Sequence, residues 1–90
     1  MTERRVVLSD HARWEAERRG VAEDNVLEVV ARPEQVAAVR PGREVRQSRI
    51  AFPPEGKIYL VRVFVDVFEE ELVVVTAYRT SKIAKYWRQR

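Results

Sequence analysis

His11 is the single histidine of the 90-residue chain, and it is the only side chain that titrates near neutral pH without a perturbing environment. Cysteine is absent, Asp66 stands alone in an apolar run, and Glu69, Glu70 and Glu71 follow one another between two such runs. These groups lack the spacing of metal ligands, so we expect neither a metal site nor a cofactor. The acid–base chemistry that this sequence favours is metal-free, with His11 as the candidate general acid or base.

Positive charge is concentrated in two parts of the chain. Residues 40–62 carry six basic and two acidic side chains, and residues 79–90 carry five basic and no acidic ones, although the net charge is only +3. Most of these groups are arginines, whose planar fork matches phosphate oxygens. Tyr86 and Trp87 lie among the basic residues of the tail and suit stacking on unpaired bases.

Two apolar runs, residues 57–68 and 72–79, must position these groups. Both are rich in β-branched and aromatic residues and lack Gly and Pro, which predicts a β-hairpin. Side chains alternate across a strand, so one face of the first arm is almost pure valine and must be covered, while Arg62 points to the other face. The residues of the apolar face are Tyr59, Val61, Val63, Val65 and Val67.

The register of this hairpin depends on its loop. A loop of the three glutamates places Phe68 opposite Leu72 and Arg62 opposite Tyr78, whereas a two-residue loop moves Arg62 to the side of Ala77. We expect the three-residue loop, because it leaves one face wholly apolar. On this register one face of the second arm holds Leu72, Val74, Thr76, Tyr78 and Thr80.

The remaining elements follow from caps and breakers. Ser9 or Asp10 begins a helix that runs to about Arg19, and a second helix covers residues 22–31. Strands are expected at residues 35–39 and 44–52, and a short helix at residues 80–87. The sequence therefore predicts one α+β domain spanning residues 1–90, with two N-terminal helices packed on an antiparallel sheet of three or four strands.

The composition also limits the location of the protein. No apolar run reaches the length of a membrane span, and the N-terminus lacks a signal-peptide core. The absence of cysteine suits a reducing compartment. We expect a cytoplasmic protein that does not act in a membrane.

Two short motifs resemble a known family. His11-Ala12 followed by Arg19-Gly20-Val21, and the later run 73–78 that ends in Thr76-Ala77-Tyr78, are similar to motifs of the small bacterial DUF4258 family. That family is grouped with the barnase, colicin and RelE-like ribonucleases, which include the BrnT toxins. The resemblance implies a ribonuclease-type scaffold whose partners are RNA and an antitoxin protein.

Cleavage of RNA by its own 2′-hydroxyl needs a base, an acid and fixed positive charge, but no metal. We therefore assign His11 as the general acid or base and Arg62, with Arg49, as the groups that stabilise the phosphorane. Tyr78 is expected at the same centre. The groups that contact or orient the substrate are expected to be Arg49, Thr76, Tyr78, Thr80 and Lys82.

Other interpretations remain open. Arg62 pairs with Asp66 or the turn glutamates if its role is structural, and Tyr78 is then a packing residue. The basic face also suits a module that binds RNA or DNA without cleaving it. A third alternative is a protein-interaction module, in which an edge strand or the tail with Ile83 and Trp87 docks another chain or a second copy in a homodimer.

Overall fold

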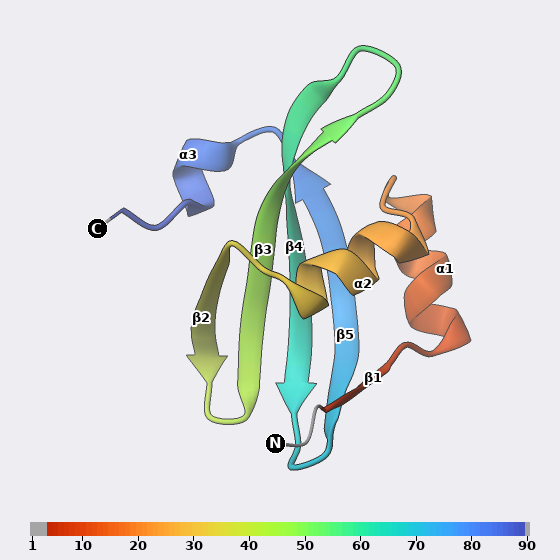
Figure 1. The fold of residues 1–90 in the computed structure, drawn as a ribbon, viewed down its shortest axis with the longest axis vertical. Helices are drawn as coiled ribbons and strands as arrows, with labels where there is room; N and C mark the ends of the chain where they lie inside the picture. Colours follow the sequence, from red (N-terminus) through yellow and green to blue (C-terminus); the bar gives the residue numbers. More distant parts are fainter. Residues whose placement is uncertain (1–3, 90) are drawn as a thin grey trace.

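The computed structural model describes residues 4–89 and contains one five-stranded sheet with helices on both faces (Figure 1). The strands lie in the order β1-β5-β4-β3-β2. The predicted α+β class is confirmed. In chain order the elements are β1 (Arg5–Val7), α1 (Asp10–Arg18), α2 (Glu23–Ala31), β2 (Gln35–Arg40), β3 (Arg43–Phe52), β4 (Lys57–Val67), β5 (Glu71–Thr80) and α3 (Ile83–Tyr86).

The expectation of a purely antiparallel sheet of three or four strands is wrong, because β1 adds a fifth, parallel strand. It pairs with β5, and Val6 lies opposite Leu72. A segment of three residues is too short to show the alternation by which a strand is predicted from sequence. The other three strand pairs are antiparallel, as predicted.

The β4–β5 hairpin contains a β-bulge at Val75. On one side of it Phe64 lies opposite Thr76, and on the other side Val65 lies opposite Val74. A bulge adds one residue to one strand and therefore changes the register along the hairpin. Both registers considered from the sequence occur in this one hairpin.

Beyond the bulge Arg62 lies opposite Tyr78, as the three-residue loop predicted, but near the turn Val67 and not Phe68 lies opposite Leu72. The faces exchange accordingly. Leu72 and Val74 were expected on the polar face, yet they are 6% and 5% exposed and belong to the core.

Helices α1 and α2 cover the valine face of the sheet, as predicted. Val61, Val63 and Val65 are fully buried, and α2 crosses in front of β4 while α1 packs beside β5 (Figure 1). The Ser9 hydroxyl caps α1 by accepting a hydrogen bond from the Ala12 amide at 3.0 Å. The core residues that the two helices and their connection supply are Ala12, Ala16, Val21, Val26, Val29 and Val30.

Within residues 4–89, the opposite face of the sheet, which we call the open face, is covered only by α3 and the few residues that follow it. Helix α3 lies apart from α1 and α2, next to β3 (Figure 1). Among residues 4–89 no helix is both long enough and apolar enough to span a membrane.

Candidate functional site

A line of four polar side chains crosses the open face, one from each of four neighbouring strands. Gln35 lies opposite Gln47, Gln47 opposite Arg62, and Arg62 opposite Tyr78. Residues directly opposite one another point to the same face, so the four side chains form one line, which we call the polar row. Gln47 Nε2 donates to Gln35 Oε1 at 2.8 Å, and Arg62 donates through Nε to Gln47 Oε1 at 2.9 Å. Arg62 Nη1 donates to the Tyr78 hydroxyl at 2.7 Å.

Residues 82–89, which we call the C-terminal segment, lie on the polar row. The Tyr86 ring stacks on Arg62, whose Cζ lies 4.2 Å from the ring centroid. The Tyr86 carbonyl accepts from Gln47 Nε2 at 3.2 Å. Gln35 pairs with the backbone of Arg88 in both directions, donating to its carbonyl at 2.9 Å and accepting from its amide at 3.1 Å.

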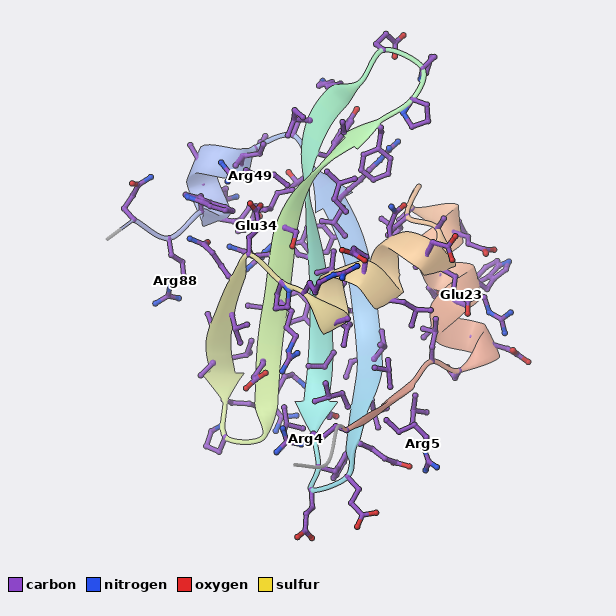
Figure 2. All side chains as sticks on the ribbon, in the orientation of Figure 1. Arg4, Arg5, Glu23, Glu34, Arg49 and Arg88 are labelled. Carbon is purple, nitrogen blue, oxygen red and sulfur yellow. The ribbon has the colours of Figure 1, made fainter. Side chains whose placement is uncertain are left out.

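Arg49 fastens the same segment at a second point. Its guanidinium stacks on Trp87, with Cζ 4.2 Å from the ring centroid, and donates to both carboxylate oxygens of Glu34 (Figure 2). Hydrogen bonds from the Arg49 side chain, and then from its backbone amide, hold the pKa of Glu34 below its ordinary value. Arg49 was predicted to contact substrate, but here it binds the chain's own carboxylate and indole.

The surroundings of the Tyr86 phenol lower its pKa. A hydrogen bond from Lys85 and the charge of Lys85 lower its pKa most, and a hydrogen bond with Tyr78 and the charge of Arg62 act in the same direction. Burial opposes these effects only in part. The cationic and hydrogen-bonding groups around Tyr86 thus favour its phenolate form.

The Arg62 guanidinium, next to this phenol, has N–H groups that make no hydrogen bond within the described residues. Its Nε and Nη1 bind within the polar row, while its Nη2 has no acceptor among residues 4–89. The Arg62 side chain is half-buried, and Lys82 and Lys85, which lie close to Tyr86 in sequence, are exposed. This part of the open face can therefore offer N–H groups and positive charge to a phosphate next to the Tyr86 phenol.

His11 does not lie at this site. It belongs to α1, which packs its Ala12 and Ala16 side against the helix-covered face, whereas Arg62 points to the open face under α3. The His11 side chain is 79% exposed, and its nearest carboxylate, on Glu15, is 3.9 Å away. The structure therefore does not bring the histidine together with Arg62.

The other residues singled out from the sequence have separate partners. Thr76 Oγ1 accepts from Arg19 Nη1 at 2.8 Å, so it joins the end of α1 to β5. Thr80 Oγ1 accepts from the Lys82 amide at 3.1 Å and shapes the start of α3. Of the seven side chains proposed from the sequence, only Arg62 and Tyr78 touch each other within the polar row.

No group of three or more His, Cys, Asp or Glu side chains within the described residues is arranged to hold a metal ion. Asp66, the isolated carboxylate, instead binds Arg43 through both oxygens, at 2.6 and 3.0 Å. Hydrogen bonding from Arg43 holds the pKa of Asp66 below its ordinary value. Asp66 thus has a structural partner on the neighbouring strand, and that partner is not Arg62.

Sequence reasoning missed Gln35, Gln47 and Lys85 at this site. Polar and apolar residues are mixed along β3, so alternation in the sequence does not assign its two faces. The useful signal was the register: once Arg62 is aligned with Gln47 and Gln47 with Gln35, four polar residues fall on one line. Tyr86 was noticed only as a residue able to stack.

The chain is thus an α+β domain with a mixed five-stranded sheet and a basic, phenol-containing site under its C-terminal segment. Neither protein-family models, nor curated proteins, nor solved structures gave a match to it.

Proposed function

We propose that the chain is a metal-independent endoribonuclease of the toxin type that binds and cleaves single-stranded RNA on its open face. The observation that carries the proposal is the stacking of Tyr86, a phenol of lowered pKa, on Arg62, a guanidinium with unused donors. The resemblance of the His11-Ala12 and Thr76-Ala77-Tyr78 motifs to a family grouped with RelE-like ribonucleases supports the same class.

In the proposed reaction the Tyr86 phenolate takes the proton of a 2′-hydroxyl, and the freed oxygen attacks the adjacent phosphorus. The bond from phosphorus to the 5′-oxygen breaks, and that oxygen receives a proton from the Lys85 ammonium. The products are a 2′,3′-cyclic phosphate and a free 5′-hydroxyl. Arg62 stabilises the charge on the phosphorane, and Tyr78 keeps Arg62 in place. The proposal gives His11 no part in this step.

Charge on the C-terminal segment supports a nucleic-acid substrate. Lys82, Lys85 and Arg88 are exposed, and residues 79–90 contain no acidic side chain. Basic groups spaced along one segment can follow a phosphate backbone and make binding depend on salt. A single strand fits better than a duplex, because only unpaired bases expose their faces to nearby aromatic rings.

The direct test incubates the purified protein with single-stranded RNA in EDTA and identifies the ends of the fragments. We expect cyclic phosphate ends, and we expect Tyr86→Phe to slow cleavage by about 100-fold or more. Tyr59→Phe is the matched control. Tyr59 packs against the core on the helix-covered face, so this variant should cleave RNA at the wild-type rate. Intact RNA after long incubation, or equal rates for the two variants, would remove the nuclease proposal.

A binding module without catalysis is the second candidate. It is favoured by the fact that two of the Arg62 nitrogens already bind within the protein, which leaves Nη2 as its main contact for phosphate. In that case RNA or DNA binds with a steep salt dependence and no fragments form. A gel shift without fragments, weakening with salt, would select this candidate.

Protein partners belong to the same proposal. An antitoxin would be expected to present acidic residues to the basic open face. A homodimer is the alternative that strand β2 offers, because it ends the sheet and its Val36 and Val39 are each 47% exposed. Analytical ultracentrifugation distinguishes a monomer that awaits a partner from a self-associating chain.

A further inference from the structure

The amide groups of the polar row have a defined direction. An arginine side chain has only donors, so the atom that Gln47 turns toward Arg62 must be its oxygen, Oε1. Its nitrogen, Nε2, is then turned the other way. Gln47 is only 2% exposed, so no solvent is at hand to correct a reversed amide.

The direction set by Arg62 passes along the row to the C-terminal segment. Gln47 Nε2 donates to Gln35 Oε1 and to the Tyr86 carbonyl. Because the Gln35 oxygen faces Gln47, its nitrogen is free to donate to the Arg88 carbonyl, and the same oxygen accepts from the Arg88 amide. Each hydrogen bond thus depends on the orientation of the amide before it.

We propose that Gln47 and Gln35 are positioning residues, which transmit the orientation of Arg62 to the backbone at Tyr86 and Arg88 and so keep the Tyr86 ring over the guanidinium. The geometric part of this inference stands on contacts within the chain. Its consequence for RNA cleavage rests on the proposed function.

Two substitutions at Gln47 break the relay in different ways. Gln47→Glu still accepts from Arg62 but cannot donate, so oxygen atoms would face the Tyr86 carbonyl and Gln35 Oε1. Gln47→Met keeps the length of the side chain and removes every hydrogen bond. Arg46→Met is the matched control, because Arg46 is the next residue back, points to the other face and binds Glu44 and the Val30 carbonyl.

The first readout is the fluorescence of Trp87, measured in a Trp14→Phe background so that one indole remains. Trp14 lies on α1 and is 56% exposed, so its replacement leaves the open face unchanged. We expect both Gln47 variants to shift Trp87 emission toward that of a solvated indole. The control should keep the emission of its parent.

The second readout is the titration of Tyr86, followed by the NMR signal of its ring carbon next to the hydroxyl. The charged and titratable groups that face this phenol are Lys85, Tyr78 and Arg62. Once the ring leaves Arg62 and Tyr78, the titration should move upward in both Gln47 variants. Neither readout uses RNA, so the inference can hold even if wild-type protein fails to cleave RNA.

If the Gln47 variants do not fold, Gln35→Glu provides the same test, because Gln35 is only half-buried and its replacement should disturb folding less. It loses the bond to the Arg88 carbonyl, and we expect the same two shifts with smaller size. The inference is overturned if folded Gln47 or Gln35 variants keep the Trp87 emission and the Tyr86 titration of their parent. With an active wild type, the Gln47 variants should lower kcat more than they raise KM.

Discussion

Arg62 and Arg79 are both stacked arginines of the β4–β5 hairpin, but they lie on opposite faces of the sheet. Arg79 lies on the helix-covered face, with Cζ 4.5 Å from the Phe52 ring centroid and 4.4 Å from that of Tyr59. Arg62 lies on the open face under Tyr86 and binds two polar side chains. The same type of residue thus packs against aromatic rings on one face and makes polar contacts as well on the other.

The difference follows from what covers each face. The two helices fully bury Val61, Val63 and Val65 at the centre of the valine face, so burial of apolar surface there supplies most of the stability. The open face also buries a few side chains, Leu60, Val45 and Gln47, but it keeps a row of polar groups whose buried atoms are all hydrogen-bonded. We therefore expect substitutions on the valine face to change stability, and substitutions on the open face to change binding and cleavage.

The largest loss of stability is expected for Val63→Ala. Val63 is fully buried between β4 and the helices, and removing two methyl groups should lower the free energy of unfolding by about 2 kcal/mol. Val75→Ala removes the same atoms at a bulge residue that is 39% exposed, and it should cost less than about 0.5 kcal/mol. Urea unfolding of both variants provides the comparison, and equal losses would contradict the assignment of the core.

Gly20→Ala should also act on the helix-covered face. Gly20 and Gly42 have the same positive φ of 84°, but a Cβ at Gly20 would lie 2.9 Å from the Arg79 guanidinium, whereas a Cβ at Gly42 meets nothing within 4 Å. We expect Gly42→Ala to cost about 1 kcal/mol from backbone strain alone, and Gly20→Ala to cost more. Thermal melts of both variants, and of Gly20→Ala combined with Arg79→Ala, isolate the contact. If the stability losses of the two single changes simply add in the double variant, the added Cβ does not clash with the Arg79 guanidinium.

A smaller effect is expected from pH at the edge of the open face. Hydrogen bonding from Arg49 keeps the pKa of Glu34 below its unfolded value, so the pair adds stability above that unfolded value. The contribution is lost as the pH falls through the folded pKa. Exposed pairs of this kind contribute at most about 1 kcal/mol. Denaturant unfolding at several acid pH values should show that the free energy of unfolding falls less with pH in Glu34→Gln than in wild type. Equal falls in the two proteins would refute this contribution of Glu34.

The smallest effect is expected for His11→Ala. The imidazole is exposed on α1, away from the polar row, so cleavage and melting temperature should stay close to those of wild type. Parallel rate assays on His11→Ala and Tyr86→Phe separate the two candidate bases. Loss of cleavage in the histidine variant, with normal folding, would return the acid–base role to His11.

Much of the fold could be predicted because periodicity is strong where a face is fully buried. The valine arm of β4, the cap at Ser9 and the order of the helices and antiparallel strands all followed from residue types. Strand β1 could not be predicted, since its pairing with the distant β5 leaves no local pattern. The bulge at Val75 was also hidden, because Val73, Val74 and Val75 suit either face equally well.

The site was predicted less well than the fold. Arg62 and Tyr78 were paired correctly, because one register brings them opposite each other. Arg49 was taken for a phosphate ligand because the sequence does not reveal that Glu34, on the connection before β2, reaches it. His11 was singled out by its intrinsic pKa and by the His11-Ala12 motif, whereas the pKa of Tyr86 is lowered by Lys85 next to it and by Tyr78 and Arg62, which only the fold brings near.

The most direct test of the account asks which face receives RNA. Amide and arginine side-chain NMR signals are followed while a single-stranded RNA with methylated 2′-oxygens, which cannot be cleaved, is added. We predict that the largest changes fall on Arg62, Tyr78 and the C-terminal segment, with α1 unaffected. Changes centred on His11 and Trp14, or none in the polar row at saturation, would contradict the claim that the open face is the functional one.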